Sequence, residues 1–285
     1  MWRRMNKAYV DTTVLTDRLL KPGPKREEAK KALAQFETTV LPEYAFKELK
    51  AGPLEHYVYF YNKLLKTEDV GEALKSLGKL IDKYHGRKRS TALEAFDAAW
   101  QLIKFQTTEE LGEEYGEEIL AEAAYEQLRL ALKGLIMKAW KRRRKVTSEV
   151  ALELPCYSEA APTESGNGQI RLPDKKCEEE ARCCLASDLR EEPDEVEKLK
   201  DAISEDAPRN CENGRRYDAL REIKRKPKMD VDDKTCRSLG DAVFAFFAPD
   251  DAVILTTNVK DHRVLANALD KDAISPGELQ QAEET

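Results

Sequence analysis

The stretch LGDAVFAFFAPDDAVILTTNVKDH, residues 239–262, decides the fold class because each of its two apolar runs borders polar groups. Asp241 directly precedes a run of apolar residues that is typical of a buried helix. The second run, residues 253–255, is short enough for a buried strand, and it leads into Asn258 and Asp261. Parallel sheets contain such buried strands and place binding groups at the carboxyl ends of the strands. The stretch therefore predicts an α/β domain.

The first 50 residues repeat this arrangement twice. Residues 7–20, KAYVDTTVLTDRLL, form an expected short strand that ends at Asp11 and passes into a helix. In residues 38–50, TTVLPEYAFKELK, β-branched residues lead to a proline that suits the first turn of a helix. Glu48 falls on the apolar face of that helix, where a carboxylate is costly unless it has a partner. Both acids are therefore candidates for the same site as Asp241.

The middle of the chain is expected to be helical. No proline occurs between Pro53 and Pro155, and apolar residues recur at steps of three and four, which is the helical period. About four helices are expected, with breaks near residues 66–69, 85–89 and 112–116.

Beyond Val146 the composition changes and then returns to the opening pattern. Two polar stretches, near residues 175–190 and 194–204, are expected to be helical, and the pair Asn213 and Gly214 predicts a turn. The strand and helix pattern resumes near residue 234. We therefore expect one discontinuous α/β domain interrupted by an α-helical insertion; the domain comprises residues 1–54 and 146–285, and the insertion residues 55–145.

The composition points to a water-soluble protein. No apolar run approaches the roughly 20 residues of a membrane-spanning helix, and the N-terminus lacks the apolar core of a secretion signal. A cytoplasmic protein with no membrane association is expected. The six cysteines show no CxxC spacing, so reduced thiols are the expectation. A structural zinc site within residues 150–236 is left open as the alternative.

The three acids suggest a chemistry. If Asp11, Glu48 and Asp241 converge, their mutual repulsion would raise their pKa values, and a divalent cation would relieve it. Oxygen ligands favour Mg²⁺ or Mn²⁺, which can lower the pKa of a bound water and stabilise charge on a phosphodiester. Amide replacement of any of the three is expected to weaken metal binding and to leave the metal-free protein no less stable.

Three motifs, YVDTTVL, EYAFKEL and LGDAVFAFFAPDDAVILTTNVKDHRVLANAL, resemble the PIN-domain family of metal-dependent nucleases, which includes the toxins of bacterial toxin–antitoxin pairs. The resemblance covers residues 7–52 and 234–275. It implies a PIN-like three-layer α/β fold with a parallel sheet. It also implies a site in which Asp11, Glu48 and Asp241 hold Mg²⁺ or Mn²⁺. Asn258 or Asp261 would fill a fourth catalytic position, and Thr12 and Thr257 would support the site.

A basic cluster, KRRRK at residues 141–145, ends the last helix of the middle region. It could complement the helix dipole, or it could contact the phosphate backbone of a nucleic acid. The candidate contact residues are Arg142, Arg143, Arg144 and Lys145. HGRKR at residues 85–89 could extend the same surface. His85 and His262 are both expected to be exposed, and contact of His262 with a substrate is left open as the alternative.

Together these observations predict a Mg²⁺- or Mn²⁺-dependent endonuclease, with RNA rather than DNA as substrate, of the toxin or defence type. An antitoxin or another protein partner is expected for a toxin, and a homo-oligomer is left open. Two alternatives remain. One is a non-catalytic PIN-like scaffold that binds nucleic acid or a protein partner, which the amide of Asn258 keeps open. The other is a nuclease directed at DNA.

Overall fold

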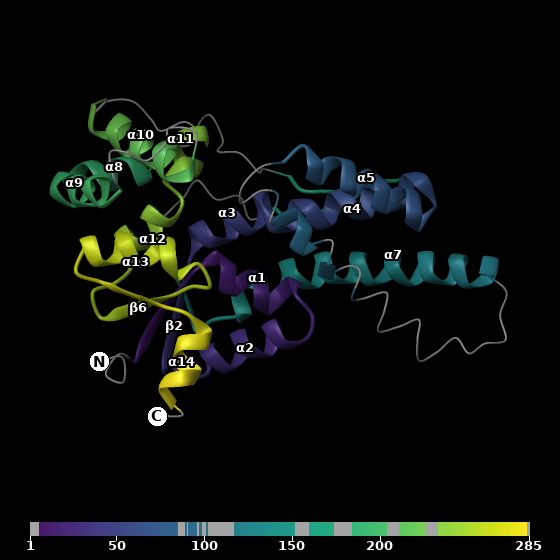
Figure 1. The fold of residues 1–285 in the computed structure, drawn as a ribbon, viewed down its shortest axis with the longest axis horizontal. Coiled ribbons are helices and arrows are strands. Elements are labelled where there is room, and N and C mark those ends of the chain that lie inside the picture. Colours follow the sequence, from purple (N-terminus) through teal and green to yellow (C-terminus); the bar gives the residue numbers. More distant parts are fainter. Residues whose placement is uncertain are drawn as a thin grey trace.

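The protein has a mixed α/β fold around a parallel sheet (Figure 1). A computed structural model describes residues 6–84, 89, 91–95, 97–98, 101, 117–151, 160–173, 184–203, 211–225 and 233–283. In this part of the chain the main sheet has five strands in the order β3-β2-β1-β6-β7. They are β1 (Lys7–Val10), β2 (Thr38–Pro42), β3 (Glu149–Ala151), β6 (Ala252–Leu255) and β7 (Asp272–Ile274). A separate antiparallel pair joins β4 (Thr163–Glu164) to β5 (Ile170–Arg171).

The order of the strands reverses direction at β1, which creates a topological switch point beside this strand. In this strand Tyr9 pairs with Val40 of β2 on one side and with Ile254 of β6 on the other, and all these pairings are parallel. The chain extends the sheet from β1 through β2 to β3, and it then returns to the opposite side of β1 for β6 and β7. Open α/β sheets bind ligands at the carboxyl ends of strands where the order reverses in this way. This edge lies directly after Val10 and Leu255.

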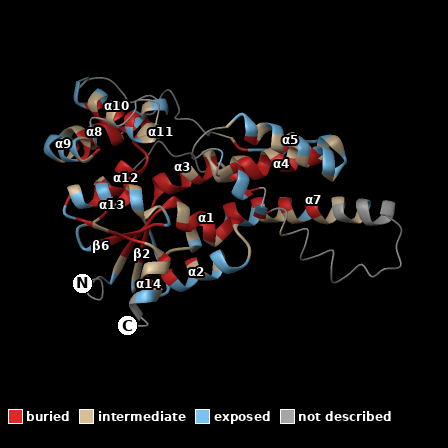
Figure 2. Cartoon of the chain, in the orientation of Figure 1, coloured by how far each residue is buried: buried red, intermediate tan, exposed pale blue. Residues whose placement is uncertain are grey.

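Helices lie on both sides of the sheet. Figure 1 shows α12 (Asp241–Phe247) and α13 (Val259–Ala268) on one side of the strands, and α2 (Pro24–Leu33) and α14 (Pro276–Glu283) on the other. Helix α1 (Thr12–Leu20) packs against α2. Buried residues concentrate along the strands and on the helix faces that cover them (Figure 2). Expected strands 8–10 and 253–255 and the expected buried helix after Asp241 are confirmed.

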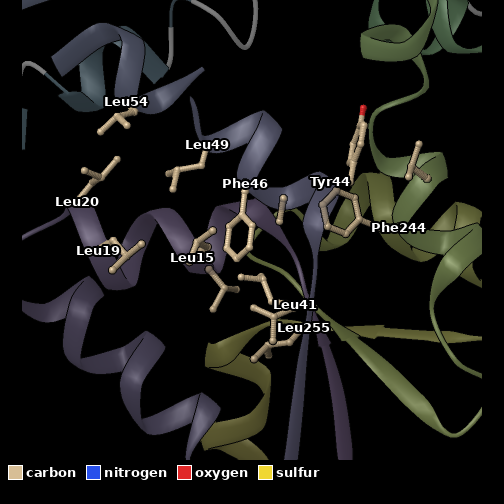
Figure 3. Packing of buried hydrophobic residues seen from close by; sticks show 14 of the residues in the cluster. Leu15, Leu19, Leu20, Leu41, Tyr44, Phe46, Leu49, Leu54, Phe244 and Leu255 are labelled. Carbon is tan, nitrogen blue, oxygen red and sulfur yellow. The ribbon is translucent and has the colours of Figure 1, made fainter. Parts of the chain in front are cut away.

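Side chains from distant segments fill the interior. Figure 3 shows Leu15 of α1, Leu41 of β2 and Leu255 of β6 close together, and all three are fully buried. Tyr44 packs edge-on against Phe244, with ring centroids 5.7 Å apart. Because each large apolar side chain removed from water stabilises the fold by roughly 1.5–3 kcal/mol, this packing holds the carboxyl ends of β1, β2 and β6 in fixed positions.

The middle region is helical where it is described. Helix α3 (Glu43–Ala51) follows β2 directly, and the middle region after it contains α4 (Pro53–Thr67), α5 (Val70–Asp82), α7 (Glu117–Arg142) and the short 3₁₀ helix η2 (Arg143–Lys145). The expected break at residues 66–69 is confirmed, since α4 ends at Thr67 and the Asp69 side chain accepts the Glu72 N–H of α5 at 2.7 Å. The expected breaks at 85–89, apart from Arg89, and at 112–116 lie outside the described residues.

The buried residues of these middle helices belong to the same hydrophobic core as the sheet. Leu64 of α4 and Leu132 of α7 have no exposed surface, and α7 packs against both α4 and α1. In Figure 1, α4, α5 and α7 run away from the sheet together. Within the described residues, no helix combines the length and the apolar character needed to cross a membrane.

Four small helices form a second group, which we call the helical cap: α8 (Cys184–Glu191), α9 (Pro193–Ala202), α10 (Glu212–Arg225) and α11 (Asp233–Leu239). The expected polar helix at 194–204 corresponds to α9. The expected turn at Asn213 and Gly214 is wrong, because both residues lie in the first turn of α10. Helix α9 packs against α13, and α10 packs against α11, so the cap lies next to the helices that begin at the carboxyl edge of the sheet.

Candidate functional site

Asp11 is held rigidly at the carboxyl end of β1. Its backbone N–H donates to the Leu255 carbonyl at 3.0 Å, which continues the pairing with β6. Its buried carboxylate caps α1, accepting the backbone N–H of Thr12 at 2.7 Å and that of Thr13 at 3.3 Å. The hydroxyls of Thr13 and Thr256 donate to its Oδ2 at 2.6 and 2.8 Å. Asp11 is thus a helix cap and a member of the site at the same time.

Asp241 begins α12 and is also fully buried. It follows Gly240, whose φ of 45° lies in the left-handed region that favours glycine. Its Oδ2 accepts a hydrogen bond from the Arg216 guanidinium at 2.9 Å and a long one from the Asn258 amide at 3.4 Å. The carboxylate of Asp241 therefore lies in a buried ion pair with the helical cap.

His262 lies between these two carboxylates. Its Nε2 is 3.5 Å from Oδ2 of Asp11 and 3.3 Å from Oδ1 of Asp241. The expectation that His262 is exposed is wrong, since the side chain has no exposed surface. The physical reason is helical phase: α13 begins at Val259, and position 262 shares the inward face of that helix with Leu265.

Electrostatics bind these three groups together. Burial by itself would lower the pKa of His262, but the charges of Asp11 and Asp241 raise it from 6.5 to about 10. Burial likewise raises the pKa of Asp11, whereas the His262 imidazolium and the Thr13 hydroxyl lower it, with a result below its ordinary value. Two buried carboxylates therefore face two cations, His262 and the permanently charged Arg216.

Glu48 joins the site through Thr12. The side chain of Glu48 is half-buried on α3, and its Oε2 accepts the Thr12 hydroxyl at 2.6 Å. The Thr12 backbone N–H donates to Asp11 in turn. Thr12 consequently links Asp11 to Glu48. Its hydroxyl is a partner that the Glu48 carboxylate needs on a packed helix face. Thr12, which the sequence predicts as a polar support, therefore lies between Asp11 and Glu48.

Asn258 and Asp261 lie at the start of α13. The Asn258 amide donates to Asp261 at 3.0 Å as well as to Asp241, so it bridges the two acids. The Thr257 side chain is exposed, and only its backbone N–H contacts the site, donating to the Thr13 hydroxyl at 3.0 Å. The hydroxyl that contacts Asp11 from this segment belongs to buried Thr256 and not to Thr257. Thr256 is the first residue after β6, and its side chain points into the protein.

As arranged here, the side chains do not fit a divalent ion. No group of three or more His, Cys, Asp and Glu side chains among the described residues is placed to hold a metal. Oδ2 of Asp11 already accepts two hydroxyls, Asp241 is paired with Arg216, and His262 lies between the carboxylates. The cation that these buried acids require is thus supplied by the chain itself.

The basic cluster at the end of α7 is divided between the interior and the surface. Arg143 is buried, donates to the Trp140 carbonyl at 2.8 Å and stacks on the Trp140 ring at 3.9 Å. Arg144 forms an ion pair with Glu43 at 3.3 Å. These two expected nucleic-acid contacts are therefore engaged within the fold. Arg142 and Lys145 are exposed. The HGRKR stretch and His85 lie outside the described residues, apart from Arg89.

Two cysteines are described fully, and neither of them forms a disulfide. Cys236 is buried, and the ammonium of Lys47 lies 3.3 Å from its sulfur. Cys211 is partly exposed. The side chains of Cys156, Cys177, Cys183 and Cys184, on which the zinc alternative also depends, are outside the described set.

Sequence reasoning missed four members of the site: Thr13, Arg216, Thr256 and the buried position of His262. For Arg216 a signal exists, because Arg216, Ala219, Leu220 and Ile223 form one helical stripe, and all four are buried. A charge on such a stripe calls for a buried partner, as it does for Glu48. The partner itself is Asp241, and only the tertiary structure reveals it.

Comparison with known proteins adds no relative: no protein-family model, no curated protein and no solved structure matches this chain.

Proposed function

We propose that the chain is a Mg²⁺- or Mn²⁺-dependent endoribonuclease of PIN type. The observation that carries the proposal is the meeting of Asp11 and Asp241 on either side of His262, beside the switch point of a parallel sheet. Open α/β sheets bind ligands at this place. The motif resemblance supports the proposal independently, because it selects the same two acids from the sequence alone.

The remaining polar groups suit a hydrolytic site. Asp11 is fixed by four donated hydrogen bonds, so its orientation is set before any ligand binds. Glu48 and Asp261 are the half-buried acids of the site, and each is oriented by a neighbouring polar side chain, Thr12 and Asn258. Of the four candidate contact residues in the basic cluster, exposed Arg142 and Lys145 remain for phosphate contacts.

A second candidate is a PIN-like scaffold that binds RNA or a protein partner without cutting. Two observations favour it. The buried Arg216–Asp241 ion pair neutralises an acid that a metal would need, and Asn258 supplies an amide rather than a carboxylate. In this candidate the acidic cluster is a structural element of the core.

Cleavage of a labelled polymer separates the two candidates. Purified wild-type protein is incubated with labelled RNA and with labelled DNA, in Mg²⁺, in Mn²⁺ and in EDTA, alongside Asp11→Asn. Asp251→Asn is the matched control, since this carboxylate is exposed and pairs only at the surface with Lys7. The proposal expects RNA cleavage by wild type and Asp251→Asn that requires metal and is lost in Asp11→Asn. If wild type binds metal but cuts neither polymer, the result favours the non-catalytic scaffold. If it cuts DNA alone, the substrate is DNA and not RNA.

A further inference from the structure

We infer that Arg216 is an internal counter-cation that keeps a divalent ion out of the acidic site until the helical cap releases it. This inference rests on the proposed function, because it takes Asp241 to be a metal ligand in the active protein. The motif resemblance implies a metal at Asp11 and Asp241, whereas the arrangement of the side chains does not fit one.

Arg216 comes neither from a strand of the sheet nor from a helix that begins at its carboxyl edge. It lies on α10 of the helical cap, and its guanidinium is only 1% exposed. Besides Asp241, it donates to the Leu239 carbonyl at 3.1 Å and to the Asn213 side chain at 2.8 Å. The cap thus delivers a positive charge to the place where the family resemblance expects a metal.

The two cations compete on electrostatic grounds. The guanidinium of Arg216 carries a positive charge, as a divalent ion does, and both would face the same carboxylate. A divalent ion bound to Asp241 would lie within a few ångströms of this buried charge, where solvent screens repulsion weakly. Asp241 has no exposed surface, and Arg216 occupies its Oδ2 while His262 faces its Oδ1 at 3.3 Å, so a metal can reach Oδ2 only if Arg216 moves away.

A released Arg216 has other partners on its own helix. Oε1 of Glu212 lies 3.5 Å from the guanidinium, and Asn213 accepts from the opposite nitrogen. The Glu212 side chain is 36% exposed, so it can follow the arginine towards solvent. If α10 moved away from Asp241, the guanidinium of Arg216 would therefore not be left as a buried charge without a partner.

Manganese binding tests the inference without reference to activity. EDTA-stripped full-length wild type, Arg216→Gln, Arg216→Lys and Arg221→Gln are titrated with Mn²⁺ in a calorimeter, with circular dichroism to confirm folding. Arg221 is the matched control, because it pairs with Asp218 at the surface of the same helix. We expect Arg216→Gln to bind Mn²⁺ at least tenfold more tightly than wild type. Arg216→Lys keeps the charge and is expected to bind like wild type, as is Arg221→Gln.

Hydrogen exchange on wild type provides a second readout, which holds even if Arg216→Gln fails to fold. Saturating Mn²⁺ is expected to speed amide exchange in residues 212–225 and to leave α4 unchanged. Unaltered exchange in α10, or a folded Arg216→Gln with unaltered or weaker Mn²⁺ affinity, would overturn the inference, as would the absence of Mn²⁺ binding to every variant. If Arg216→Gln binds Mn²⁺ tightly but cleaves no RNA, the counter-cation role of Arg216 stands and the proposed nuclease function is wrong.

Discussion

The guanidinium of Arg216 lies 2.9 Å from the carboxylate of Asp241, and the two side chains are 1% and 0% exposed. This ion pair explains how a carboxylate can lie fully buried at the start of α12. Burial of an ionised acid is costly unless a cation accompanies it. Here the helical cap supplies one cation and α13 supplies a second, His262, so the acidic centre is balanced within the chain.

Asp241→Asn is expected to destabilise the metal-free protein by about 3 kcal/mol, because it leaves the Arg216 charge buried without its counter-ion. This replaces the expectation from the sequence that amide substitution would relieve repulsion and cost nothing. Urea unfolding in EDTA measures the change, and Asp250→Asn, whose carboxylate is 98% exposed, serves as control. Equal unfolding midpoints for Asp241→Asn and wild type would show that the ion pair contributes no stability.

Thr256→Val is expected to destabilise the protein by roughly 1–3 kcal/mol, because it removes a buried hydroxyl that donates to Asp11 and accepts the Asn258 N–H at 3.0 Å. Valine keeps the shape, so the loss reports on the hydrogen bonds. Thr257→Val is the neighbouring control and should change stability by less than about 0.5 kcal/mol, since that side chain is exposed. The reverse order, with Thr257 the more sensitive, would contradict the assignment of the supporting hydroxyl.

The double variant Arg142→Glu and Lys145→Glu is expected to bind RNA more weakly than wild type and with a smaller dependence on salt. Each lost phosphate contact should reduce the slope of log affinity against log salt by about 0.7 for a single strand. Fluorescence anisotropy with labelled RNA at several salt concentrations gives both quantities. Unchanged affinity at low salt would mean that Arg142 and Lys145 serve the dipole of α7 and not a nucleic acid.

The stability of the metal-free protein is expected to depend on pH through His262. Its pKa is raised from 6.5 to about 10 on folding, so the imidazolium contributes its full stabilisation below pH 6.5. That contribution declines above pH 6.5 and is lost once the pH passes 10. The stability difference between wild type and His262→Gln, measured by urea unfolding in EDTA at pH 6 and pH 9.5, should therefore shrink at the higher pH. A difference that grows with pH would mean that the histidine is buried neutral.

Much of the fold could be predicted because local pattern and tertiary position agree. Strands β1 and β6 are short apolar runs followed by polar residues, and this pattern arises wherever a buried strand ends at the edge of a parallel sheet. Strand β3 carried no such signal. Its sequence, EVA, pairs with β2 in a register set in part by reciprocal hydrogen bonds between Thr39 and Ser148, which are 109 residues apart.

Some residues of the site could likewise be predicted from the sequence, and others could not. Asp11 and Asp241 could be selected because each acid lies at the boundary of an apolar run. Arg216 lies in a polar stretch 25 residues before its partner, and the distance along the chain says nothing about the ion pair. Thr256 and Thr257 are chemically identical, so only the direction of each side chain after β6 distinguishes the support from the exposed residue.

Anomalous X-ray scattering from crystals of Arg216→Gln soaked in Mn²⁺ tests the central claim most directly, because it locates the ion. We predict an anomalous peak within bonding distance, about 2.2 Å, of carboxylate oxygens of both Asp11 and Asp241. A peak confined to surface acids such as Asp250, or no peak with the two carboxylates still in contact with His262, would contradict the claim that these acids form a metal-dependent active site.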